Sequence, residues 1–380
     1  MRTLRITGGE ILLPAGIERD GDFLLADGQI QSLGSGSGDM RFNASGLLVL
    51  PGIVDIHGDA FERQMQPRPG VDFPADLALR DTEAQLLSNG ITTAFHGVTL
   101  SWEPGLRSMD AWSRMLNALE AGKWTADMRI HLRWEAFNLD ALDTALADIA
   151  AGRVHLLAFN DHTPAILRKL EDAIAGAKYA DRAGMKMEAF KTLATRIGSS
   201  SDAVPGALDR ISAAARAAGL PMASHDDESL ARRDYFRHHG ARICEFPMAE
   251  EVGQAARDAG DYVVMGSPNV VRGRSHLGWA SAAVLAEAGI CNVLSSDYFY
   301  PAMARAALIL AGRGVLDLPH AWALISANPA EATGLTDRGS IEPGKRADIV
   351  VVDPATSRAV LTVAQGRIAH ITAAGASRLG

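Results

Sequence analysis

Short apolar runs separated by turn residues fill both ends of the chain. Four such runs are Leu4–Ile6, Glu10–Leu13, Ala347–Asp353 and Leu361–Gly366. Glycine and aspartate punctuate the segments around them, which is typical of short strands joined by tight turns. Because chain termini often lie close together, we predict that residues 1–50 and 335–380 build one composite β-sandwich domain.

Between these ends the pattern changes to apolar runs that alternate with Ala- and Leu-rich amphipathic stretches. This alternation is typical of a parallel α/β sheet. The candidate strands are Leu47–Ile56, Ile91–Phe95, Met128–Leu132, Val154–Phe159, Pro221–Ala223, Ala241–Cys244, Tyr262–Met265 and Cys291–Leu294. Their number is the one that a closed (β/α)8 barrel needs. We therefore predict an α/β protein with a TIM barrel over residues 51–334.

One connection is longer than a barrel requires. Residues 168–201, between the fourth and fifth candidate strands, are rich in charge and contain glycine. Long connections in compact domains are commonly functional. We expect a lid or an additional helical excursion there.

Composition and charge narrow the class of partner. The 380 residues are 47% hydrophobic and 22% charged, with a formal net charge of −8. An acidic balance argues against nucleic acid as a partner, although a local basic pocket could still bind a small anionic substrate. The cysteines, Cys244 and Cys291, lie in apolar runs and indicate neither a disulfide framework nor a thiolate metal site. The sequence contains no apolar stretch of about 18 residues or more. We therefore expect a cytoplasmic protein without membrane association. A homo-oligomer is possible.

Imidazole and carboxylate side chains follow nearly every candidate barrel strand. In chain order they are His57, Asp59, Glu135, His162, His225, Glu245 and Asp297. In a barrel, strand ends meet at one face, where the chemistry of such enzymes takes place. This shared position predicts a functional site.

A divalent metal ion explains these residue types. Imidazole and carboxylate ligands suit one or two Zn²⁺ ions, with Mn²⁺ or Fe²⁺ as alternatives. His57 and Asp59 are two residues apart, so an extended segment directs both to one side. Glu135 is expected to bridge to a second ion that His162 or His225 completes. Water activated by the metal would attack the substrate while Asp297 accepts its proton, and Glu245 joins the candidate ligands.

Each of these residues also has a purely structural interpretation. A His-X-Asp triplet after a strand can cap a helix, and His225 and Asp297 can open helices in the same way. Glu245 can be a buried, paired carboxylate. His131 and His155 lie within strand patterns, and we interpret both as structural. These interpretations do not explain why such residues recur at successive strand ends.

Two motifs resemble those of the amidohydrolase superfamily. Leu50–His57, read LPGIVDIH, is similar to the LPG-x-x-D-x-H entry into that superfamily's barrel, and Gly339–Val350 resembles its return into the β-sandwich. Most members carry His-x-His at the first strand, whereas this chain has Asp59 at the second position. No lysine ends a candidate strand, so a carbamylated lysine is not expected.

Further motifs resemble a narrower family, the triphosphate diphosphatases of the carbon–phosphorus lyase pathway of phosphonate use. They are His57–Asp59, Pro67–Pro69, Asp161–His162, Ser224–Asp227, Pro268–Gly273 and Ser295–Tyr298. The resemblance implies hydrolysis of a ribosyl triphosphate between its α and β phosphorus atoms, with release of pyrophosphate. Segment Phe61–Gln64 departs from the family pattern, which puts substrate contacts there in doubt.

A triphosphate requires cationic contacts, and we expect them largely in the loop after the seventh strand. The candidate substrate-binding residues are Arg68, Asn269, Arg272, Arg274 and His276. Arginine binds phosphate oxygens through two parallel hydrogen bonds. The first alternative function is hydrolysis of a cyclic amide or an N-acyl substrate, which needs no such clamp. The second is a metal-retaining scaffold without activity.

Overall fold

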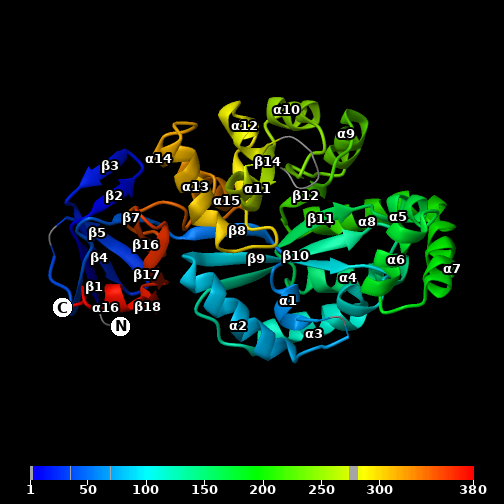
Figure 1. The fold of residues 1–380 in the computed structure, drawn as a ribbon, viewed down its shortest axis with the longest axis horizontal. Coiled ribbons are helices and arrows are strands. Elements are labelled where there is room, and N and C mark those ends of the chain that lie inside the picture. Colours follow the sequence, from blue (N-terminus) through cyan, green and yellow to red (C-terminus); the bar gives the residue numbers. More distant parts are fainter. Residues whose placement is uncertain (1–2, 35, 69, 274–280) are drawn as a thin grey trace.

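The computed structural model describes residues 3–34, 36–68, 70–273 and 281–380. Eight parallel strands pair in chain order in a single sheet. They are β8 (Ile53–Gly58), β9 (Ile91–Leu100), β10 (Asp127–Glu135), β11 (Leu156–Asn160), β12 (Met222–His225), β13 (Ile243–Glu245), β14 (Tyr262–Gly266) and β15 (Val293–Ser295). Helices surround this sheet (Figure 1). The predicted TIM barrel is confirmed.

The barrel closes between its first and last strands through one backbone bridge. Gly58 pairs in parallel with Asp297. The Asp297 amide donates to the His57 carbonyl at 3.0 Å, and the Asp59 amide donates to the Asp297 carbonyl at 2.9 Å. The triplet at residues 57–59 and the acid after the last strand are therefore neighbours.

A buried carboxylate supports this closure. Asp55 accepts hydrogen bonds from the Ser296 amide at 3.0 Å and from the Ser296 hydroxyl at 2.6 Å. Burial alone raises the pKa of Asp55, while the bonds from Ser296 oppose that rise. Asp55 thus ties the end of β8 to the segment that carries Asp297.

The expected single strand over residues 47–56 is wrong. The chain forms β7 (Leu48–Pro51) in the terminal sandwich and then β8 in the barrel, with Gly52 between them. A Cβ atom at Gly52 would lie 2.4 Å from the Thr92 hydroxyl oxygen. This approach leaves no room for a side chain where the chain passes from one sheet to the other.

Two sheets form the sandwich at the ends of the chain. One has the order β5 (Gln29–Leu33), β4 (Asp22–Ala26), β1 (Leu4–Thr7) and β6 (Met40–Asn43). The other has the order β18 (Arg367–Ile371), β17 (Arg358–Ala364), β16 (Ile349–Asp353), β7, β2 (Glu10–Leu13) and β3 (Gly16–Arg19). Buried residues of both ends, including Phe23, Phe42, Val351 and Leu361, share one apolar core. Both termini lie in this part of the molecule (Figure 1).

Helices cover the outside of the barrel and complete its connections. They are α1 (Glu62–Met65), α2 (Ala75–Ser88), α3 (Met109–Ala121), α4 (Leu142–Ala150), α8 (Val204–Ala217), α9 (Leu230–His238), α10 (Glu250–Asp258), α11 (Ser267–Arg272), α12 (Ala282–Glu287), α13 (Ala302–Gly312), α14 (Leu318–Ala323) and α15 (Ala327–Ala332), while α16 (Ala373–Ala376) lies near the C-terminus. No helix within the described ranges is both long and apolar enough to cross a membrane. Cys244 and Cys291 are buried and free.

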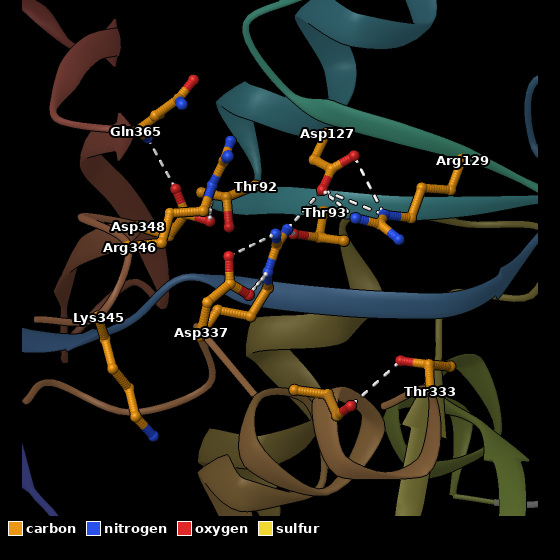
Figure 2. A network of polar contacts seen from close by, with 12 residues as sticks. Thr92, Thr93, Asp127, Arg129, Thr333, Asp337, Lys345, Arg346, Asp348 and Gln365 are labelled. Carbon is orange, nitrogen blue, oxygen red and sulfur yellow. Dashed lines mark hydrogen bonds and ion pairs between the residues drawn. The ribbon is translucent and has the colours of Figure 1, made fainter. Parts of the chain in front are cut away.

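A polar network joins the return segment to the base of the barrel (Figure 2). Arg338 donates to Asp127 at 2.6 Å and to the Thr93 hydroxyl at 2.7 Å. Arg129 also binds Asp127, at 2.9 Å. Asp127 and Thr93 belong to β10 and β9, so this network fixes the chain leaving the barrel against two of its strands.

The expected excursion consists of three helices between β11 and α8. They are α5 (Thr163–Lys169), α6 (Ala173–Arg182) and α7 (Met187–Gly198). Ile166, Leu170, Ala180, Phe190 and Ala194 form a small apolar cluster within it. The excursion lies at the opposite end of the molecule from the sandwich (Figure 1).

Candidate active site

Alternation along β10 decides which of its side chains reach the barrel interior. Ile130, Leu132 and Trp134 join the outer apolar layer. Successive residues of a strand point to opposite sides, so His131, Arg133 and Glu135 point inward.

His57, His131 and Glu245 converge in the barrel from three different strands. Their side-chain ligand atoms lie within 4.8 Å of one another, and all three residues are buried. His57 Nδ1 lies 3.0 Å from Glu245 Oε1, and His131 Nε2 lies 3.8 Å from the same oxygen. None of these three atoms has a properly aligned hydrogen-bond partner.

The tautomer of His131 follows from its backbone contact. His131 Nδ1 lies 3.0 Å from the Ile56 carbonyl oxygen, to which it must donate. Its Nε2 therefore carries a lone pair that faces a carboxylate oxygen. The lone pairs of His131 Nε2 and of the carboxylate oxygen are both buried with no donor between them, which favours the binding of a cation there.

The protonation states of this group fit metal ligation. Burial, followed by the Arg133 charge, lowers the pKa of His57 well below its usual value. Burial lowers the pKa of His131 to about 3. Both imidazoles are therefore neutral, as metal ligands must be. Burial raises the pKa of Glu245 to about 7, and a bound cation would stabilise its charged form.

A second group lies beside the first. His162, His225 and Asp226 could also hold an ion, since their ligand atoms lie within 4.8 Å of one another. Asp226 Oδ2 lies 3.8 Å from His162 Nε2 and 3.6 Å from His225 Nε2. The His57 and His225 rings stack with centroids 5.2 Å apart, and His225 Nδ1 lies 3.3 Å from Glu245 Oε2. Glu245 thus contacts both groups.

Glu135 is held by the start of α5 instead. It accepts hydrogen bonds from the His162 and Thr163 amides at 3.2 Å and from the Thr163 hydroxyl at 2.8 Å. His162 Nδ1 lies 3.3 Å from its Oε2 atom. Burial alone would raise the pKa of Glu135, but His162 and Thr163 lower it overall. Burial opposes charge on His162, yet Asp226 and Glu135 raise its pKa to about 8.

Arg133 crosses the site between these groups. Its Nη2 atom lies 2.9 Å from His225 Nε2, and its Nη1 atom lies 3.8 Å from Asp59. Gly97 on the neighbouring strand gives it room, since a Cβ atom there would lie 3.2 Å from Arg133 Cδ. Asp59 is in neither ligand group formed by the described residues.

Asp297 and Asp59 are two further acids of the site. Burial and then the charge of Asp59 raise the pKa of Asp297 to about 7. Burial and then Glu62 raise the pKa of Asp59 to about 6. The backbones of Asp297 and Asp226 have φ angles of 55° and 56°, which non-glycine residues rarely adopt and which often mark functional sites.

Part of this site, namely Asp59, Arg133, His162, His225 and Asp226, lines a cavity of about 720 Å³. Six cationic side chains line it, namely Arg107, Arg133, Arg168, Lys169, Arg182 and Arg232. Five carboxylates also line it, namely Asp59, Glu103, Asp161, Asp226 and Glu228. These cations outnumber the carboxylates of the lining, in a chain of net charge −8.

The residues expected to bind substrate lie elsewhere or outside the described ranges. Arg68 is exposed, and Arg272 is exposed with its Nη1 atom 3.4 Å from the Tyr298 hydroxyl. Asn269 accepts a hydrogen bond from the Ala282 amide at 3.0 Å. None of these three lines the cavity. Arg274 and His276 fall within 274–280, outside the described residues.

Three residues of the site were absent from the expected set: His131, Arg133 and Asp226. His131 was interpreted as structural because it lies within a strand. The alternation of His131, Arg133 and Glu135 along the strand was the available signal, since residues two and four apart lie on one face. Asp226 carried no comparable signal, because a helix cap explained it equally well.

The model of the amidohydrolase family matches residues 48–376. Alpha-D-ribose 1-methylphosphonate 5-triphosphate diphosphatase of Escherichia coli (strain K12) is 34% identical over 315 residues, which cover 80% of this chain and 82% of that protein. A dihydroorotase of Citrifermentans bemidjiense is 36% identical over 80 residues, 20% of this chain and 18% of that protein.

Solved structures share the fold at low sequence identity. A triazine hydrolase variant has a TM-score of 0.66 at 16% identity, covering 97% of this chain and 94% of its own. A beta-aspartyl dipeptidase from Fervidobacterium islandicum AW-1 has a TM-score of 0.64 at 14% identity, covering 98% and 97%.

Proposed function

Because the chain belongs to the amidohydrolase family, we propose that it is a metal-dependent diphosphatase of phosphonate metabolism. Its proposed substrate is α-D-ribose 1-methylphosphonate 5-triphosphate, cleaved at the α–β phosphoanhydride to release pyrophosphate. Identity to the Escherichia coli diphosphatase supports the substrate. The observation that carries the proposal is the cation-rich cavity beside two convergent ligand groups.

The ligand atoms of both groups fit one or two divalent ions. His57, His131 and Glu245 would hold one ion, and His162, His225 and Asp226 a second. Zn²⁺ suits these ligands, with Mn²⁺ or Fe²⁺ as alternatives. When bound, such ions supply an activated water and neutralise charge on phosphate oxygens. Asp59 and Glu135 stay candidate ligands through their positions next to the two groups.

The chain's own residues perform the remaining tasks. Asp297 is the proposed proton acceptor, because its raised pKa of about 7 lies near the working pH of a general base. Arg133, buried between Asp59 and His225, would orient a phosphoryl oxygen through its planar donors. Phosphoryl transfer depends chiefly on such positioning and charge stabilisation.

Hydrolysis of a cyclic amide or an N-acyl substrate is the alternative, because the chain belongs to the amidohydrolase family. A neutral cyclic amide needs no cationic pocket. Arg168 and Lys169 line the cavity, and neither has a carboxylate within ion-pair distance among the described residues. Unneutralised cations of this kind favour an anionic substrate.

Product analysis by phosphorus NMR tests the proposal. The metal-loaded enzyme should convert the ribosyl triphosphate into pyrophosphate and a 5-phosphate. Dihydroorotate and N-acyl amino acids, followed by proton NMR, should remain intact. Turnover of an amide with no release of pyrophosphate from the triphosphate would reject the diphosphatase in favour of the alternative.

A further inference from the structure

The excursion α5–α7 brings cations to the cavity from outside the ordinary barrel. Arg168 and Lys169 end α5, and Tyr179 and Arg182 belong to α6; all four line the cavity. A single helix, α8, would suffice to connect β11 with β12 in a barrel of this kind. The barrel connection does not require the additional helices. Their residues that line the cavity indicate a function in ligand binding.

The excursion is fastened where it meets the barrel. Trp102 donates through its indole N–H to the Thr163 hydroxyl at 2.8 Å, and its ring lies 5.6 Å from that of Phe190. Arg182 forms an ion pair with Glu103, whose side chain is only 5% exposed. These contacts join the start of α5, the end of α6 and the first turn of α7 to the segment that follows β9. The helices that carry the cations are thus fixed beside the cavity.

Lys169, Tyr179 and Arg182 form a continuous polar edge. Lys169 Nζ lies 3.2 Å from the Tyr179 hydroxyl, and the Arg182 guanidinium lies 5.0 Å from the Tyr179 ring centre. Arg182 has Glu103 as a carboxylate partner, whereas Arg168 and Lys169 have none among the described residues. Two adjacent cations without a counter-ion, facing a cavity, provide charge for an anionic ligand.

His162, His225, Asp226 and Arg133 line the same cavity as these cations. Glu245 of the first ligand group contacts His225. Residues that can hold metal and cations from an added segment therefore share one cavity. A substrate that reaches both needs one reacting phosphoryl group at the ligand groups and further negative charge at the cations. A chain of phosphates has this form, and a cyclic amide does not.

We propose that Arg168, Lys169 and Arg182 form a subsite for the terminal phosphates of the substrate, the part that leaves as pyrophosphate. The identification of those phosphates as a leaving group rests on the proposed function. The cation subsite itself binds a di- or triphosphate chain whether or not the chain is hydrolysed. It is the specificity determinant that separates this chain from a barrel built for neutral substrates.

The test compares an Arg168→Ala/Lys169→Ala double variant with a Lys191→Ala/Arg196→Ala double variant in the metal-loaded enzyme. Lys191 and Arg196 are exposed cations of α7 that do not line the cavity. Inorganic tripolyphosphate serves as the probe, with its affinity measured by calorimetry and its inhibition of hydrolysis by kinetics. Thermal unfolding confirms that both variants are folded.

We expect the first variant to weaken tripolyphosphate binding and raise KM by about tenfold or more, since each lost charge-assisted contact costs around that factor. The kcat value should stay within about threefold, because these residues contact the departing end rather than the reacting atoms. Arg168→Lys should keep most of the affinity, whereas Arg168→Glu should lose more than Arg168→Ala. The α7 variant should match the wild type.

The outcomes separate the subsite from the proposed function. Unchanged tripolyphosphate affinity and KM in the Arg168→Ala/Lys169→Ala variant would overturn the subsite and leave the diphosphatase activity standing. Binding of tripolyphosphate that depends on Arg168 and Lys169, without hydrolysis of the ribosyl triphosphate, would overturn the proposed reaction and support the subsite. An equal loss in both double variants would show non-specific attraction and would also overturn the subsite.

Discussion

His131 Nε2 faces Glu245 Oε1 across 3.8 Å in the buried interior of the barrel, and neither atom has a hydrogen-bond partner. The Nδ1 proton of His131 is committed to the Ile56 carbonyl. The two facing atoms are therefore both acceptors. Their arrangement, with His57 as the third member, is the strongest structural sign of a cation site in this protein.

His131→Ala should reduce bound metal, because it removes one of three convergent ligand atoms. Mutation of a residue that only hydrogen-bonds to a metal ligand lowers metal affinity about 10–100-fold, so loss of a ligand itself should cost at least as much. Metal analysis by inductively coupled plasma mass spectrometry checks this. His320→Ala, at an exposed surface position, is the matched control. Full metal occupancy in the His131 variant would return this residue to a structural role.

Asp297→Asn should slow hydrolysis by about 10²–10⁴-fold while metal content is retained, the range that a general base contributes. The base must be ionised, so the rate of the wild type should rise with pH up to the pKa of Asp297. Burial and the Asp59 charge place that pKa at about 7, and a bound cation would shift it downward. The pH–rate profiles of the wild type and the variant test whether Asp297 is the general base. If the variant shows the same fall in rate at low pH, another residue is the base.

Arg133→Lys should lower kcat by about tenfold or more without loss of metal. A lysine keeps the charge but not the planar pair of donors that approaches His225 and Asp59. Steady-state kinetics beside metal analysis separates the two effects. Normal kcat in the lysine variant would show that charge alone is sufficient at this position.

Asp127→Asn should lower the free energy of unfolding by about 1–3 kcal/mol at pH 7, since it breaks charge-assisted hydrogen bonds to Arg129 and Arg338. Burial alone would raise the pKa of Asp127, but these arginines lower it overall from its usual value of 3.8. Its stabilisation is therefore present above about pH 4 and is lost as pH falls through the lowered pKa. Denaturant unfolding at several pH values should show the difference from wild type shrinking in acid. The exposed pair Asp110–Arg114 provides the control, as Asp110→Asn should have little effect.

Gly52→Ala should destabilise the protein by about 1–3 kcal/mol, because the new methyl group would overlap the Thr92 side chain. Gly206→Ala is the counterpart within α8, where a Cβ atom meets nothing within 4 Å. There alanine should be neutral or stabilise the helix by up to about 1 kcal/mol. Thermal and denaturant unfolding measure both. Equal stability of the Gly52 variant and the wild type would show that the junction can shift to make room.

Much of the architecture was determined by the sequence alone. The alternation of apolar runs with amphipathic stretches encodes the barrel, because strand and helix periods are local properties of the chain. The short strands at both ends likewise indicated the sandwich. The recurrence of imidazoles and carboxylates after His57 placed a site at one face, since parallel strands all end there.

Only the tertiary structure decided which of these side chains meet. Glu245 reaches both ligand groups, whereas Glu135 is bound by the start of α5. His131 belongs with His57 although 74 residues separate them. Such contacts depend on barrel closure and on the direction of each side chain, and residue spacing encodes neither across distant strands. The cations of α5 and α6 reach the cavity for the same reason, because the folding of the excursion over the barrel is a matter of packing.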